Sequence, residues 1–192
     1  PGGALQLRVG ANPVLTDLAI RLGPHILIPQ PLSHGQWLAE LTRGSSIVAR
    51  ATLKQRSNNR GDVILNLLTE ILAPGLSSDD IPCLTTLIPA PLLSNSLVVA
   101  RRHGTYLHTP AFSLADPSVN ALFSGPSLDE WSLVLPNDWF VWQLDAASLA
   151  ASCVTNGLLL HITSRSPWQP PLTPGRAHAL QFRLHLPVGI IP

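Results

Sequence analysis

The side chains best suited to metal chemistry in this chain are its histidines, which number seven among 192 residues. His34 and Glu40 lie near each other in the sequence, and His178 follows a Pro-Gly dipeptide far downstream. A metal site needs several converging ligands, each oriented by further hydrogen bonds. The histidines are scattered along the chain, so we expect no bound metal and no cofactor.

No serine or carboxylate has the neighbours that catalysis requires. Ser45-Ser46 and Ser124-Gly125 lack a Gly-x-Ser-x-Gly setting. Asp79-Asp80 and Asp129-Glu130 are adjacent in sequence, so on a strand their carboxylates would point to opposite faces. There is also no glycine-rich phosphate loop. We therefore expect a protein that is not an enzyme.

Two basic clusters are the best candidates for contact with RNA. The first consists of Lys54, Arg56 and Arg60, and the second is Arg101 with Arg102. Such side chains bind phosphates without regard to base sequence, and salt weakens the contact. An ordinary polar turn would look the same, and neither cluster is interleaved with stacking aromatics. The clusters predict a weak and non-specific contact.

The composition favours association with other protein chains. Charged residues make up 12% of the chain, about half of the usual share, and hydrophobic residues make up 45%. Too few surface charges promote association. The net charge is +1, and residues 1–20 contain only Arg8, offset by Asp17, so no basic arm for nucleic acid is present.

Several negative features narrow the cellular setting that we expect. No apolar run approaches the ~18 residues of a membrane span, and no signal peptide is visible, so no membrane partner is predicted. Cys83 and Cys153 are too few for a disulfide framework, and we expect two buried thiols in a reducing compartment. The chain begins with Pro1 and has no methionine, which predicts either cleavage from a longer precursor or trimming of the N-terminus.

Alternation of apolar and polar residues predicts a mostly β structure. In 46–54, Ile47, Ala49, Ala51 and Leu53 fall on one face of a strand, and 63–68 is apolar on both faces apart from one asparagine. Near the C-terminus, Leu180, Phe182, Leu184 and Leu186 alternate with Gln181, Arg183 and His185. Frequent prolines mark many short loops. The spacing predicts about eight or nine strands in a single domain spanning 1–192.

The order of these elements resembles the capsid proteins of picorna-like viruses, most closely the small coat protein of plant secovirids. Ser33–Thr42 would be a helix before the strand Ser46–Lys54, and Asp62–Thr69 would be the next strand. Asp79–Leu84 would be a second helix, and Trp131–Pro136 has the form Trp-x-Leu-x-x-Pro that occurs late in that family. The resemblance implies an eight-stranded antiparallel jelly-roll β-sandwich with two short helices.

The same resemblance implies a structural subunit of an icosahedral shell, cut from a polyprotein. Its partners would be copies of itself, other capsid proteins or domains and, weakly, genomic RNA. It would be found in the virion, and in the host cytoplasm before assembly. The loops Pro74–Pro91, His108–Glu130 and Ser164–Gly175 are then expected to meet neighbours or the outside.

Two other classes remain as alternatives. A β-sandwich carbohydrate-binding module would need exposed aromatic platforms, which Trp139, Trp142 and Trp168 could supply. A cupin-type enzyme would use His34, Glu40 and His178, although the paired His-x-His of that family is absent.

Overall fold

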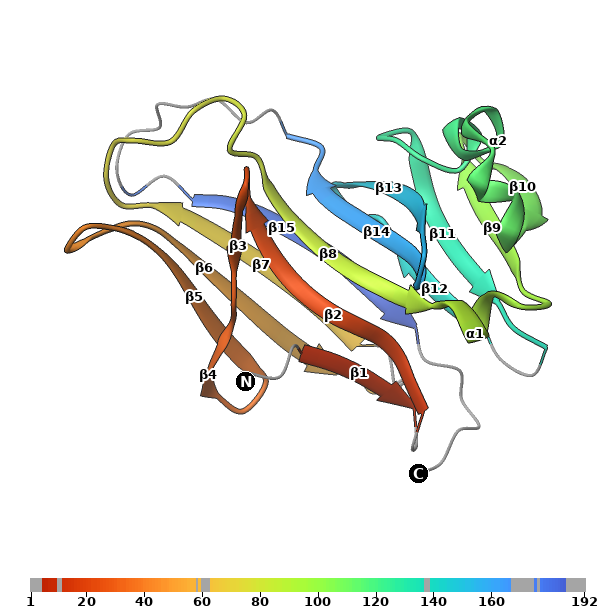
Figure 1. The fold of residues 1–192 in the computed structure, drawn as a ribbon, viewed down its shortest axis with the longest axis horizontal. Helices are drawn as coiled ribbons and strands as arrows, with labels where there is room; N and C mark the ends of the chain where they lie inside the picture. The colour runs from red at the N-terminus through yellow and green to blue at the C-terminus, as the bar shows by residue number, and fades with distance from the viewer. Residues whose placement is uncertain are drawn as a thin grey trace.

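The computed structural model of the chain is an all-β sandwich in which two antiparallel sheets pack face to face (Figure 1). The structure describes residues 5–9, 12–57, 59, 63–136, 139–166, 175 and 177–185. Within these residues there are fifteen strands, two short α-helices and one 3-10 helix. The number of strands exceeds the eight or nine that the sequence spacing predicted and the eight that the resemblance implied.

The smaller sheet forms the front layer in Figure 1. Its strands run in the order β1 (Leu5–Val9), β2 (Asn12–Leu22), β8 (Pro82–Pro89), β14 (Gly157–Ser164) and β13 (Ala147–Val154), and β3 (His25–Leu27) also pairs with β2. The β13–β14 hairpin turns at Thr155-Asn156. Gly157 follows this turn with φ 152°, and a Cβ there would lie 2.0 Å from the Ile88 carbonyl oxygen. Only glycine therefore lets β14 approach β8 so closely.

The larger sheet forms the second layer and extends beyond the smaller one. Its order is β10 (Thr105–Pro110), β9 (Leu97–Arg102), β11 (Leu128–Val134), β12 (Trp139–Gln143), β15 (Ala177–His185), β7 (Val63–Ile71), β6 (Ser46–Ser57), β5 (Gln36–Arg43) and β4 (Gln30–Ser33). The predicted strand 46–54 is confirmed as part of β6, and residues 63–69 of the predicted strand 62–69 are confirmed as part of β7; Asp62 lies outside the described residues. They pair antiparallel from Ala49 opposite Ile71 to Ser57 opposite Val63.

The core lies between the sheets and draws side chains from both. On β6, Ala49, Ala51 and Leu53 are fully buried, as their alternation predicted. They join Leu84 of β8 and Leu160 of β14 in one hydrophobic cluster. At the other end of the larger sheet, Trp131 and Trp142 are directly paired across β11 and β12 and pack edge to face, with ring centroids 6.3 Å apart. A core shared by both sheets makes them mutually dependent.

Both helices predicted from the sequence are wrong. Ser33–Thr42 is not helical: it forms the end of β4, a turn and most of β5. Trp37, Leu38 and Leu41 fit a helix face locally, but the segment pairs with β6 from Gln36 opposite Lys54 to Arg43 opposite Ser46. Gly35 and Gly44 close the turns at its two ends with φ of 68° and 61°. Pairing along a whole strand outweighs a weak local helix preference.

The second predicted helix, Asp79–Leu84, is a turn followed by a strand. The Asp80 carboxylate accepts hydrogen bonds from the Ser77 backbone N–H at 2.6 Å and from its hydroxyl at 3.0 Å. Asp80 thus closes a tight turn instead of capping a helix. Pro82 begins β8, which lies between β2 and β14 in the smaller sheet.

The actual helices lie within, or at the end of, segments that the sequence predicted to be long loops. They are α1 (Ala90–Leu93), the 3-10 helix η1 (Ala111–Ala115) and α2 (Pro117–Leu122). The Asp116 side chain caps α2 by accepting from the Ser118 backbone N–H at 2.8 Å. Loop Pro74–Pro91 contains the whole of β8, and His108–Glu130 contains η1 and α2. Most of Ser164–Gly175 lies outside the described residues.

The alternation predicted near the C-terminus is confirmed for the residues whose side chains the structure describes. On β15, Leu180 is buried, and Gln181 and Arg183 are exposed, as predicted. The side chains of Phe182, Leu184 and His185, and the whole of Leu186, lie outside the described residues.

The prediction of two buried thiols is wrong for one of the two cysteines. Cys83 is buried as expected, but Cys153 is exposed near the end of β13.

Candidate functional site: the outer face of the larger sheet

Strand register gathers positive charge on the outer face of the larger sheet. Lys54 and Arg56 point outward from β6, because Leu53, the residue before Lys54, points into the core and side chains alternate along a strand. Arg56 lies opposite Ile64 on β7, and Ile64 lies opposite Arg183 on β15. Directly opposite residues share a face, so Arg183 points the same way as Arg56. We call Lys54, Arg56 and Arg183 the basic patch.

Uncharged amides surround the basic patch. Lys54 lies between Gln36 of β5 and Asn66 of β7, and Asn66 lies opposite Gln181. Arg183 donates a hydrogen bond from Nη1 to Oε1 of Gln143 at 3.0 Å. Among the described residues, no carboxylate lies directly opposite Lys54, Arg56 or Arg183; the nearest one in the Arg183 row is Glu130, opposite Gln143 and two strand spacings away. The patch can therefore attract an anion without first breaking an ion pair.

The spacing of the patch suits an extended anion. Lys54 and Arg56 are two residues apart on one strand, or about 7 Å. Arg56 and Arg183 are separated by two strand spacings, or about 10 Å. A chain of phosphates could contact more than one of these groups at once, and the amides could donate further hydrogen bonds.

The neighbouring row of the same face is electrically balanced. Arg50 of β6 forms an ion pair with Glu40 of β5, Nη2 to Oε1 at 2.9 Å, and it also lies opposite Glu70 of β7. Exposed pairs of this kind contribute little stability. Their effect here is to leave Arg50 with no net attraction for an anion.

The second predicted cluster is mostly used within the fold. Arg102 donates from Nη2 to the Ser124 carbonyl at 2.7 Å and to the Ala121 carbonyl at 3.4 Å. It therefore ties the end of α2 to β9. Arg101 lies opposite Glu130, and its Nε is 4.0 Å from Oδ2 of Asp129.

Of the five predicted RNA contacts, Lys54 and Arg56 form no ion pair with any residue that the structure describes, whereas Arg101 and Arg102 have intramolecular partners. Arg60 lies outside the described residues. Sequence reasoning did not select Arg183 as a site residue. The alternation in 180–186 did predict that it points outward, but the pairing of β15 with β7 joins residues more than a hundred positions apart, and no local pattern shows it.

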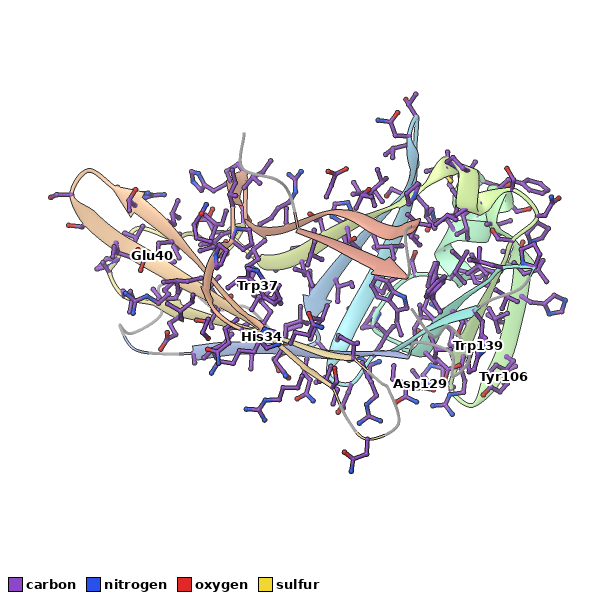
Figure 2. The ribbon with its side chains drawn as sticks, turned by 90° about the horizontal axis from the view of Figure 1, so that it is seen from below. His34, Trp37, Glu40, Tyr106, Asp129 and Trp139 are labelled. Atoms are coloured by element: carbon purple, nitrogen blue, oxygen red, sulfur yellow. The ribbon has the colours of Figure 1, made fainter. Side chains whose placement is uncertain are left out.

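The residues of the cupin alternative are not brought together. In one row across the sheet, Glu40 of β5 lies opposite Arg50 of β6, Arg50 lies opposite Glu70 of β7, and Glu70 lies opposite Ala177 of β15. The strands β5 and β15 are therefore three strand spacings apart, or about 14 Å. Glu40 is paired with Arg50, and His34 lies in the turn before β5, well separated from Glu40 (Figure 2). Among the described residues, no group of three or more candidate ligands could hold a metal ion.

One cysteine–histidine contact lies on the outer face of the smaller sheet. The Sγ atom of Cys83 is 3.9 Å from Nδ1 of His161. Burial raises the pKa of Cys83 to about 11, although nearby Arg21 opposes this. Burial, and then Arg21, lowers the pKa of His161. Both groups are therefore neutral at pH 7, whereas a nucleophilic cysteine needs its thiolate form.

The tryptophans proposed as a carbohydrate platform do not share a surface. Trp139 is 46% exposed on the outer face, whereas Trp142 is 1% exposed in the core. Trp168 lies outside the described residues. A flat sugar-stacking surface needs neighbouring exposed rings, and these two point to opposite sides of β12.

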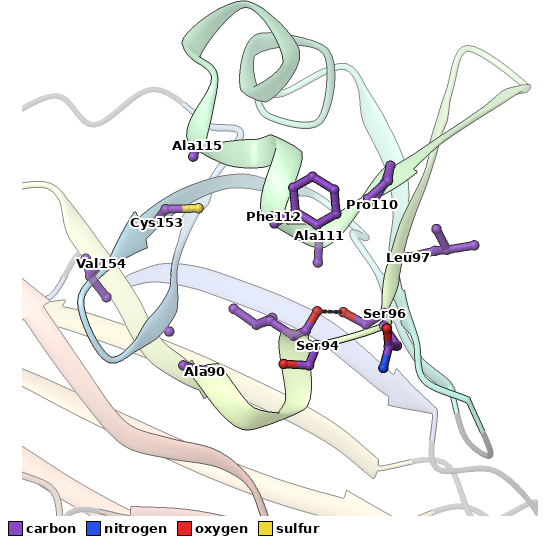
Figure 3. Close-up of a pocket in the computed structure, with 13 residues that line it drawn as sticks. Ala90, Ser94, Ser96, Leu97, Pro110, Ala111, Phe112, Ala115, Cys153 and Val154 are labelled. Carbon is purple, nitrogen blue, oxygen red and sulfur yellow. Dashed lines mark hydrogen bonds between the residues drawn. The ribbon is translucent and has the colours of Figure 1, made fainter.

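A shallow apolar pocket lies beside α1, η1 and the end of β13 (Figure 3). Its volume is about 810 Å³, and its lining includes Leu97, Pro110, Phe112, Cys153 and Val154. Phe112 is 74% exposed. Cys153 is the one titratable side chain of this lining, so the pocket offers contact area and no acid–base pair.

In the part of the chain that the structure describes, no helix has the length and apolar character needed to cross a bilayer. No family model matches the chain, and no curated protein matches its sequence.

Proposed function

We propose that this chain is a structural subunit of an icosahedral virus capsid, which self-assembles through protein–protein contacts around an RNA genome. The subunit would be a virion component and would have no enzymatic role. The all-β sandwich supports this proposal, because two packed sheets make a rigid block that can be repeated in a shell. The proposal treats the sandwich as an elaborated jelly roll with additional strands.

The observation that carries the proposal is the amount of large apolar surface on a sandwich with few charges. Among the described residues, ten large hydrophobic side chains are exposed: Ile26, Ile28, Leu32, Ile81, Leu97, Tyr106, Phe112, Leu122, Trp139 and Val154. Several of them gather at the β9–β10 end. Apolar patches of this kind on a soluble protein mark interaction surfaces.

Sedimentation at neutral pH, followed by electron microscopy, tests this proposal. We expect species much heavier than one chain, and closed particles with icosahedral symmetry. A monodisperse species with the mass of one chain at micromolar concentration would refute it.

The basic patch is the proposed contact with RNA. With three phosphate contacts, the logarithm of the binding constant should fall with the logarithm of salt concentration with a slope of about −2. Arg56→Gln should reduce that slope by about 0.7. Arg50→Gln is the matched control, because Arg50 lies on the same strand and face but is paired with Glu40. Equal effects of the two substitutions would exclude the patch as the binding surface.

A further inference from the structure

The strand β10 (Thr105–Pro110) is an unprotected edge of the larger sheet. Among the strands that the structure describes, it is the last in the order, and β9 is its one neighbour. Its sequence, Thr-Tyr-Leu-His-Thr-Pro, contains no lysine, arginine or carboxylate. Exposed edges normally carry charges or bulges that prevent pairing with another chain.

The edge of the smaller sheet at β13 is covered, in contrast to β10. The Gly125 backbone N–H donates to the Leu149 carbonyl at 2.7 Å, and Asn120 Nδ2 donates to the Ala151 carbonyl at 2.6 Å. The Ser124 hydroxyl in turn accepts from the Ala151 N–H at 3.3 Å. The segment around α2 thus covers the β13 edge of the smaller sheet, whereas β10, one of the two edges of the larger sheet, has no comparable cover among the described residues.

The turn before β10 determines which backbone groups face outward. His103 and Gly104 both have positive φ, 48° and 79°, as in a type I′ two-residue hairpin. In such a hairpin the flanking residues Arg102 and Thr105 form a hydrogen-bonded pair. By alternation, Leu107 and Thr109 also bond to β9, and the N–H and C=O groups of Tyr106 and His108 point away from it.

We propose that β10 pairs antiparallel with β10 of a second copy of this chain, about a two-fold axis at Leu107. In this register Tyr106 of one copy and His108 of the other exchange N–H···O=C bonds on both sides of the axis. Shifting the register by two residues would place Pro110, which has no N–H, or the turn residue Gly104 opposite a bonding residue. The chosen register therefore satisfies the most outward-facing groups.

The side chains are also complementary in this register. Leu107 of one copy contacts Leu107 of the other copy on the inner face, where each already packs against its own core. Tyr106, which is 60% exposed, lies beside the imidazole of His108 from the other copy on the outer face. A six-residue edge buries less than the ~1,200 Å² of a standard interface. It is thus one modest contact among several, and the inference rests on the proposed function in that respect.

Disulfide trapping tests the register directly. In a non-hydrogen-bonded pair the Cα atoms are about 4.5 Å apart, within the range that a disulfide spans. In a Cys153→Ser background, Leu107→Cys should therefore form a covalent dimer under mild oxidation. Thr109→Cys is the matched control, since it faces Thr105 of the other copy and is about 13 Å from its own equivalent.

A second experiment leaves Leu107 unchanged, so its result does not depend on whether Leu107→Cys folds. Thr105→Cys and Thr109→Cys, mixed in equal amounts, should form a mixed disulfide that neither gives alone. Adding His108→Pro should slow trapping about tenfold, because it removes an outward N–H on each side of the axis. The thermal midpoint of the subunit should change little, since the ladder to β9 does not use that N–H.

The outcomes separate this inference from the proposed function. Trapping of Leu107→Cys and of the mixture, without trapping of Thr109→Cys alone, supports the edge contact. Equal trapping of all variants would overturn it as non-specific collision. No trapping in a chain that still forms particles would overturn the edge contact and leave the capsid proposal intact. No trapping in a chain that stays monomeric would overturn both.

Discussion

Replacing Trp142 with alanine should destabilise the protein far more than the same replacement at Trp139. Both residues lie on β12, but they point to opposite faces: Trp142 is 1% exposed and Trp139 is 46% exposed. A buried tryptophan removes about 200 Å² from water, which at ~25 cal/mol/Å² is worth about 5 kcal/mol as an upper bound. The edge-to-face contact of Trp142 with Trp131 adds about 0.5–1.5 kcal/mol.

Trp142→Ala should therefore lower the free energy of unfolding by about 3–5 kcal/mol. Trp139→Ala leaves no internal cavity and should cost at most about 2 kcal/mol, since roughly half of its area is already in water. Urea titration followed by far-ultraviolet circular dichroism measures both values without relying on the fluorophore that is removed. Equal costs, or a larger cost at Trp139, would refute the assignment of faces on β12.

Three further outcomes follow from the structure. Gly157→Ala should lower the free energy of unfolding by at least about 2–3 kcal/mol, because the new Cβ would meet the Ile88 carbonyl. Gly44→Ala should lower it by about 1 kcal/mol, because Gly44 has positive φ but no atom within 4 Å of the new Cβ; thermal unfolding of the two variants compares these costs. A disulfide-exchange reagent at about pH 8 should titrate Cys153 in the folded protein and Cys83 only after unfolding, since burial raises the pKa of Cys83 to about 11. Burial lowers the pKa of His161 from 6.5, so below pH 6.5 the unfolded chain binds more protons than the folded chain. The free energy of unfolding should therefore fall as the pH drops below 6.5. Urea titrations at a series of pH values should show a smaller fall for His161→Gln.

Local sequence patterns were sufficient to predict the buried face of a strand where apolar and polar residues alternate along it. In β6, Ala49, Ala51 and Leu53 had to share one face whatever their partners were, and that face is buried. The all-β class and the outward direction of Arg183 followed from the same kind of information.

Only the tertiary structure decided between strand and helix in Gln36–Arg43, where the apolar spacing satisfies both. Pairing with β6 fixed it as a strand, and interstrand hydrogen bonding depends on residues that a local window does not contain. The same holds for Asp80: the sequence predicted a helix over Asp79–Leu84, but the Asp80 carboxylate closes a turn with Ser77.

The candidate site shows the same division. The sequence by itself determined that the chain has few charges, that Lys54 and Arg56 lie on the polar face of a strand, and that no serine or glycine-rich motif is present. Tertiary structure decided which cations remain available. It placed Arg183 in the same cross-strand row as Arg56, with Ile64 between them, and it used Arg102 to hold α2 and Arg50 to pair with Glu40. The reason is that availability of a charge depends on what lies opposite it across neighbouring strands, and strand order in a sheet is set by long-range packing of the whole chain.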